Sequence, residues 1–178
     1  GYHSSPLDFV RDPTSWLRDL TDRRATHTQA PSFAFGLAAR KFLSSPCRLR
    51  VDLSSLLHAT NGAEPIRAAD VDAFCSAFAA HGLRRDAVVA TYGLAEHTVF
   101  VCSGGTQVLR VDKAALERSN EVRVCTGPEE PSEAVMVGCG FPARKRPEGV
   151  EPVEVVIVAV SDDEEGTGAS PSAPLGED

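Results

Sequence analysis

The sequence lacks the features that mark membrane-spanning and nucleic-acid-binding proteins. It has no run of about 18 apolar residues, so we expect no membrane span. Its formal net charge is −7 and its pI is near 5.2, and its Lys and Arg residues are scattered along the chain. An acidic chain without a basic stripe argues against a nucleic-acid partner and against a basic membrane-surface protein.

Cysteine motifs for metal binding or redox chemistry are also absent. No C-x-x-C occurs, and no cysteine–histidine group has the spacing of a zinc site. The odd number of widely spaced cysteines indicates reduced thiols, mostly buried, and hence a cytoplasmic protein. Cys139 lies between two glycines, but no histidine or acid nearby in the sequence is placed to activate it as a nucleophile. We therefore expect structural thiols at Cys47, Cys75, Cys102, Cys125 and Cys139.

The N-terminus has neither an initiator methionine nor the basic start and apolar stretch of a signal peptide. The chain has 178 residues and a mass of 18.9 kDa, and 42% of its residues are hydrophobic. This length and composition suit one domain with a buried core, or a piece of a larger domain. We expect a chain that has been cut from something longer.

Hydrophobic periodicity predicts helices that alternate with short strands in the first half of the chain. One helix begins near Pro13 with Asp12 as its N-cap, after a turn in the stretch SPLDFV. A second helix follows Pro31, because the residue before a proline avoids the α region. The clearest helix, in RAADVDAFCSAFAAHGL, stops at Gly82. A short buried strand is expected over residues 49–53, and another in AVVATY.

The second half of the sequence is richer in strand formers. Strands are expected at residues 107–111 and 121–125, with a short helix at 113–118 between them. The strongest β segments are EAVMVGCGFP and VEPVEVVIVAV. We therefore predict an α/β fold with a mixed sheet flanked by helices, followed by the start of a smaller β-rich subdomain. The expected domains are an α/β part over residues 1–126, a β-rich part over 127–160 and an acidic, disordered tail over 161–178.

Two turn motifs, NGAEP at residues 61–65 and TYGLAE at 91–96, each follow a short strand. In open α/β sheets, ligands bind beyond the carboxyl ends of the strands, so two such turns can form the walls of one nucleotide pocket. Gly62 and Gly93 let the backbone approach a ligand closely. Tyr92 offers a ring or a hydroxyl, and Glu96 offers a hard oxygen ligand for Mg²⁺. From spacing alone, an ordinary turn before a helix and a solvated carboxylate remain open as alternatives.

The motifs NGAEPI and TYGLAEHTVFV, about 30 residues apart, resemble those of the adenylate-forming acyl/aryl-CoA synthetase superfamily, and within it the fatty acyl-AMP ligases. Further support comes from residues 5–42, from RVDLSSLLHATNGAEPI and from VGCGFP, in the same order and spacing as in that family. The connection GGTQVLRVDKAALERSNEVRV also looks more like these ligases than like acyl-CoA synthetases. The resemblance covers about residues 5–160 and implies part of an AMP-binding, adenylate-forming N-terminal domain.

The resemblance also implies a reaction and a set of site residues. A fatty acid is activated with ATP to an acyl-adenylate and pyrophosphate, with Mg²⁺ present, for transfer to an acyl carrier protein or a polyketide synthase. Tyr92 is expected to pack on adenine, Gly93 to lie close to the α-phosphate, and Glu96 to bind Mg²⁺. The adenine pocket is expected to contain Gly62, Ala63, Glu64 and Pro65, and the acyl tunnel is expected to lie beside Phe33 and Phe35.

Three elements of the family pattern are missing from the sequence. There is no phosphate loop rich in Ser, Thr and Gly, no Thr-Gly-Asp for the ribose, and no C-terminal domain with a catalytic lysine. We therefore expect a fragment of a fatty acyl-AMP ligase that does not catalyse adenylation by itself. The alternative is a degenerate adenylate-forming-like domain that acts as a lipid- or nucleotide-binding module or a protein-interaction module. An unrelated α/β binding domain is the third interpretation.

Overall fold

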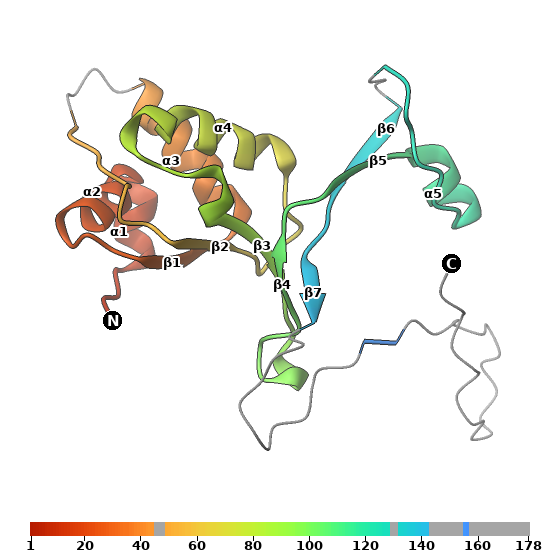
Figure 1. Cartoon of the computed structure of the whole chain (residues 1–178), viewed down its shortest axis with the longest axis horizontal. Coiled ribbons are helices and arrows are strands. Elements are labelled where there is room, and N and C mark those ends of the chain that lie inside the picture. The colour runs from red at the N-terminus through yellow and green to blue at the C-terminus, as the bar shows by residue number, and fades with distance from the viewer. Residues whose placement is uncertain (45–48, 129–131, 143–154, 157–178) are drawn as a thin grey trace. The chain divides into compact units, whose positions relative to one another are not determined.

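The computed structural model describes residues 1–44, 49–128, 132–142 and 155–156 (Figure 1). The chain divides into two compact units, Gly1–Phe141 and Pro142–Asp178. In the second unit only Pro142 and the exposed pair Val155 and Val156 are described. Most of the strand expected in VEPVEVVIVAV, and the acidic tail, lie outside the described residues. The domain boundaries drawn from the sequence stay a prediction.

A five-stranded mixed sheet organises the first unit, and it confirms the predicted fold class. Its strand order is β1-β2-β3-β4-β7, with β1, β2 and β3 parallel and β4 antiparallel to β3. A separate antiparallel pair, β5 and β6, is connected through the short helix α5. The strands are β1 (His27–Ala30), β2 (His58–Asn61), β3 (Val88–Tyr92), β4 (Cys102–Gly105), β5 (Val108–Asp112), β6 (Glu133–Val137) and β7 (Gly140–Pro142), and α5 spans Lys113–Ser119.

Helices pack on one face of the parallel strands, as Figure 1 shows for α3 and α4. These helices are α1 (Pro6–Arg11), α2 (Thr14–Asp22), α3 (Ser32–Ser44) and α4 (Ala68–Phe78). The core contains Phe35 from α3 and Phe74 and Phe78 from α4, together with Ala59 from β2 and Val88 from β3. Because side chains alternate along a strand, the neighbours of Ala59 on β2 and of Val88 on β3 face away from the helices.

The helix starts follow from local chemistry, and one differs from the expectation. Helix α2 begins near Pro13, as predicted, but its N-cap is Pro13 and not Asp12, although Oδ1 of Asp12 accepts a hydrogen bond from the Thr14 backbone N–H at 3.0 Å. The turn predicted in SPLDFV is instead helix α1, because the Ser5 hydroxyl accepts from the Leu7 N–H and caps it. Gly82, with φ of +83°, ends the helical run after α4, as predicted.

Two predicted strands are wrong within the described part of the chain. Residues 49–53 form no strand, although Val51 and Leu53 are buried, and the Leu53 N–H donates to the carbonyl of His81 at 2.8 Å. The strand comes later, as β2, because only there does the backbone pair with β1 and β3. In the stretch 121–125, the described residues form only an isolated bridge between Val111 and Val124.

Within the described residues, no helix has both the length and the apolar character needed to cross a membrane. The four described cysteines are free thiols. Only Cys75 is buried, and Cys102, Cys125 and Cys139 are half-buried, so the expectation of mostly buried thiols is wrong for these three. Cys47 lies outside the described residues.

Candidate functional site

The two turn motifs lie side by side at one edge of the sheet. Asn61 ends β2 and is paired in register with Ala90 on the parallel neighbour β3, so residues 61–65 and 91–96 leave adjacent carboxyl ends. The Thr91 hydroxyl donates to the carbonyl of Asn61 at 3.2 Å. A Cβ at Gly62 would lie 2.5 Å from that hydroxyl oxygen, so this close approach requires glycine.

The first turn is fixed to the N-terminus of α3. The Phe33 N–H donates to Oε1 of Glu64 at 2.7 Å, and the Arg67 N–H donates to the buried Ser32 hydroxyl at 3.0 Å. An acidic side chain is favourable at a helix N-terminus, because it satisfies a free N–H and faces the positive end of the helix dipole. Directly before Glu64, the backbone of Ala63 adopts a φ of +70°, which is uncommon for a residue other than glycine.

The second turn folds back on itself. A Cβ at Gly93 would lie 1.3 Å from the carbonyl oxygen of Val99, so no larger residue fits without moving the loop. The Val99 N–H donates to the Leu94 carbonyl at 2.9 Å, and Val99 has a φ of +75°. A β-branched residue in this region is a backbone outlier of the kind that concentrates at functional sites. Tyr92, at the start of this loop, is 51% exposed and presents its ring to the surface.

Glu96 lies in the short 3₁₀ helix η3 (Ala95–His97) within this loop, and its side chain is exposed. Among the described residues, none donates a hydrogen bond or forms an ion pair with its carboxylate. No group of three or more His, Cys, Asp or Glu residues that suits a metal is found in the described ranges. One free carboxylate therefore fits only an ion that keeps most of its waters and shares phosphate oxygens, as Mg²⁺ does.

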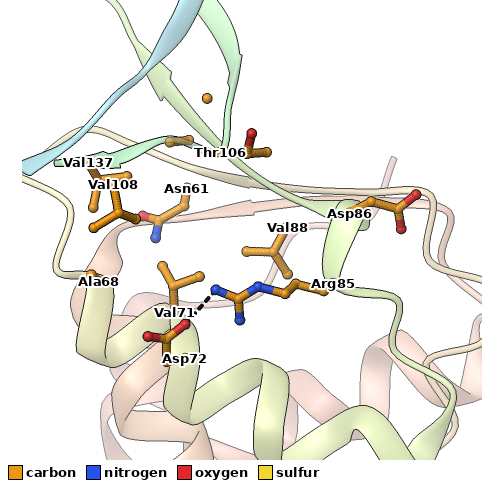
Figure 2. A pocket seen from close by; sticks show the side chains of 12 residues that line it. Asn61, Ala68, Val71, Asp72, Arg85, Asp86, Val88, Thr106, Val108 and Val137 are labelled. Atoms are coloured by element: carbon orange, nitrogen blue, oxygen red, sulfur yellow. Dashed lines mark hydrogen bonds and ion pairs between the residues drawn. The ribbon is translucent and has the colours of Figure 1, made fainter.

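Beside the turns, a pocket of about 330 Å³ opens between α4, β3 and the β5–β6 pair (Figure 2). Its walls are largely aliphatic and include Val71 from α4, Val88 from β3, Val108 from β5 and Val137 from β6. Apolar walls with a few polar groups are typical of small-molecule sites.

One buried polar side chain, Asn61, lines this pocket. The residue is 1% exposed, and among the described residues none forms a hydrogen bond with its Nδ2 or Oδ1 atom. A buried amide without partners costs free energy that a ligand or a water can recover. Asn61 is the first residue of the NGAEP motif, but the motif predicts no role for it. The alternation of β2 contained the signal, since Asn61 shares the helix-facing side with buried Ala59.

The two phenylalanines expected beside an acyl tunnel differ in their environments. Phe35 is fully buried, and its ring packs against Trp16 at 5.3 Å and Phe74 at 5.0 Å between centroids. Phe33 is 46% exposed at the start of α3, next to Glu64. Neither residue lines the pocket that contains Asn61, so an acyl contact by either stays a prediction.

Cys139 shows no sign of activation as a nucleophile. Burial raises the pKa of its thiol above the ordinary value, whereas nucleophilic attack requires the thiolate. The structural interpretation of this residue therefore agrees with its environment.

The similar proteins found by comparison with known sequences and structures include several fatty acid ligases. The medium-chain-fatty-acid–[acyl-carrier-protein] ligase JamA of Moorena producens is 37% identical over 145 residues, which are 79% of this chain and 24% of JamA. The long-chain-fatty-acid–AMP ligase FadD32 of Mycobacterium marinum is 34% identical over 76% of this chain and 23% of its own length. The crystal structure of the fatty acid AMP ligase from Legionella pneumophila superposes with a TM-score of 0.67 and 30% identity. The chain is homologous to part of a fatty acyl-AMP ligase.

The match covers most of this chain but only about a quarter of each fatty acyl-AMP ligase, 26% in the Legionella structure and 24% in JamA. A second Legionella structure, a fatty acyl-adenylate ligase in complex with acyl adenylate and pyrophosphate, superposes with a TM-score of 0.65 and 32% identity over 86% of this chain. No family model matches the chain. The resemblance inferred from the turn motifs is confirmed, and the roles of individual residues stay predictions.

Proposed function

We propose that this chain forms the part of a fatty acyl-AMP ligase that binds the acyl-adenylate. In the proposed reaction, a carboxylate oxygen of the fatty acid bonds to the α-phosphorus of ATP while the bond to pyrophosphate breaks. Such a transfer depends on positioning and on neutralising phosphate charge. The observation that carries the proposal is the pair of adjacent turns at the carboxyl ends of β2 and β3, with an apolar pocket next to them.

The nucleotide would lie across the two turns. The backbone of residues 62–65 forms one wall, held by Glu64 at the start of α3, and the exposed ring of Tyr92 offers a surface for stacking on adenine. Gly93 leaves the backbone bare next to the α-phosphate. Glu96 would hold Mg²⁺, which supplies positive charge at the phosphate oxygens.

The acyl chain would lie in the pocket that begins at Asn61, because this residue directly precedes Gly62 in the nucleotide-binding turn. The amide of Asn61 can donate to the carboxyl oxygen of the acid, and the aliphatic walls beyond it suit a hydrocarbon chain. An acyl carrier protein is the proposed acceptor, since the relative JamA is named as a ligase for that partner. A polyketide synthase is the alternative acceptor of the acyl group in this proposal.

Isothermal titration with a non-hydrolysable acyl-adenylate analogue, an acyl-sulfamoyl adenosine, tests the proposal. We expect binding to the chain, strengthened by Mg²⁺. Tyr92→Ala should weaken binding about 5- to 150-fold, because stacking of an aromatic ring on a base contributes about 1–3 kcal/mol. Glu96→Ala should remove the dependence on Mg²⁺ while leaving the metal-free affinity unchanged.

The matched control is Glu117→Ala, which removes an exposed carboxylate on α5, away from the two turns. It should bind as the unaltered chain does. If a folded chain binds no analogue, or if Tyr92→Ala and Glu117→Ala have the same effect, the two turns do not form an adenylate site. The chain would then serve as a degenerate module of this family.

A further inference from the structure

An ion pair lines the pocket on the side where β3 begins, five residues before Ala90, the residue that is paired with Asn61. Asp72 is on α4, and Arg85 is in the 3₁₀ helix η2 (Arg85–Ala87) just before β3, so the pair joins two walls of the pocket. Their closest N–O distance is 2.5 Å, and Figure 2 shows the interaction below Val88. The two side chains are 64% and 59% exposed. Exposed pairs of this kind are weak, so this one can open without a large loss of stability.

The apolar walls between Asn61 and the ion pair are short. Asn61 is paired with Ala90, and Val88 lies two residues earlier on β3, a rise of about 7 Å. On α4, Ala68 and Asp72 are four residues apart, a rise of about 6 Å. A hydrocarbon chain that starts at Asn61 therefore reaches the charged groups after a limited number of methylenes.

We propose that the Asp72–Arg85 ion pair sets the acyl-chain length at which affinity for this pocket stops rising. The inference rests on the proposed function, because it assumes that the pocket holds the acyl chain. Each methylene buried against Val71, Val88 and Val108 should improve affinity about fourfold. A methylene that reaches the ion pair must lie against charges or displace them into water, so it gains nothing. Longer chains are then tolerated but bind no more tightly.

The experiment measures affinity for two ligand series that differ only in chain length. One series is acyl-sulfamoyl adenosines, and the other is free fatty acids below their micelle concentration. For the unaltered chain, affinity should rise about fourfold per methylene and then level off. In the double variant Asp72→Leu with Arg85→Met, apolar side chains replace both charges. Its levelling-off should move to a longer chain, with the longest ligands binding at least about fourfold tighter than to the unaltered chain.

A second double variant, Asp19→Leu with Arg23→Met, is the matched control. It removes an exposed ion pair on α2 with an N–O distance of 3.5 Å, and neither residue lines the pocket. Its affinity should level off at the same acyl-chain length as the affinity of the unaltered chain. Circular dichroism and urea unfolding of each variant establish that it is folded before binding is compared.

The outcomes separate this inference from the proposed function. Sulfamoyl adenosine without an acyl group reports on the nucleotide turns alone. If it binds but the levelling-off stays at the same length in the pocket variant, the ion pair does not set chain length and the proposed function stands. If it does not bind while the fatty acid series shifts as expected, the pocket assignment holds and the adenylate proposal fails. If neither series depends on chain length, the pocket holds no acyl chain and the inference is wrong.

Discussion

Replacement of Asn61 by leucine should make the protein more stable and a poorer ligand-binding protein. The two side chains have the same number of heavy atoms and the same branching, so the change removes polarity and keeps the shape, and the larger methyl groups have room in the adjoining pocket. Asn61 is 1% exposed, and no described residue pairs with either polar atom of its amide. Asn61→Leu therefore removes an unsatisfied amide and adds no cavity.

The expected gain follows from the cost of leaving such a group without partners. A buried donor or acceptor without a hydrogen bond costs about 1–3 kcal/mol. In a dry pocket, Asn61→Leu should therefore raise the free energy of unfolding by about 1–3 kcal/mol. Each kcal/mol should raise the melting temperature by about 2–4 °C for a chain of this size. Water bound to the amide in the pocket of about 330 Å³ would reduce the gain towards zero.

Urea unfolding followed by far-UV circular dichroism measures the change, and the single tryptophan, Trp16, which packs half-buried against the core, gives a second signal. A higher urea concentration at the midpoint, with an unchanged dependence of the unfolding free energy on urea concentration, would assign the effect to stability. Thr60→Val is the matched control, because Thr60 is the neighbouring residue of β2 and is not among the residues that line the pocket. It should change stability by no more than about 0.5 kcal/mol.

Two results would contradict the reasoning. A loss of stability in Asn61→Leu larger than in the Thr60→Val control would mean that the amide has partners in the folded chain. A gain of stability together with unchanged affinity for acyl-sulfamoyl adenosine would mean that the amide plays no part in binding. The combination of higher stability and weaker binding is the usual signature of a polar group kept for function.

Two further predictions concern the second turn and the start of α2. Gly93→Ala should lower the free energy of unfolding by more than about 1 kcal/mol, because the added methyl group overlaps a backbone carbonyl. Gly127→Ala is the control, because no atom lies within 4 Å of the added carbon. Thermal unfolding measures both variants, and the control should be near neutral. Asp12→Asn should be less stable than the unaltered chain at pH 7, because hydrogen bonds from Thr14 and Arg18 lower the pKa of the Asp12 carboxyl. A lowered pKa stabilises the fold above the ordinary value of 3.8 and loses this effect as the pH falls below it. The urea midpoints of the two proteins should therefore converge in acid, and a constant difference across that range would exclude this cause.

The sequence predicted the parts of the fold that depend on neighbours along the chain. The helix after Pro31, the stop at Gly82 and the short helix after β5 all follow from local capping and turn chemistry, and the structure contains each of them. The turn motifs also indicated the family, because the residues proposed to bind a nucleotide form two short contiguous stretches of the sequence. Their convergence needed only the rule that parallel strands place their carboxyl ends together.

Strand placement was less predictable, because a strand exists only when it has a partner. Val51 and Leu53 alternate as the buried residues of a strand should, yet they pack in the core without joining the sheet. Hydrophobic patterning records burial but not which backbone is available for pairing. The helix at residues 6–11, where a turn was expected, is a different case, because the Ser5 cap that starts it is a local signal already present in the sequence.

The sequence by itself determined the family, the two turns and the helices that support them, because these depend on short-range chemistry. Only the tertiary structure decided that Glu64 holds the start of α3, that Phe35 is core, and that Asn61 is left without partners. It also brought Asp72 and Arg85 together in the lining of a pocket. These contacts join residues that are 13 to 31 positions apart or depend on which strand face meets a helix, so no local pattern encodes them.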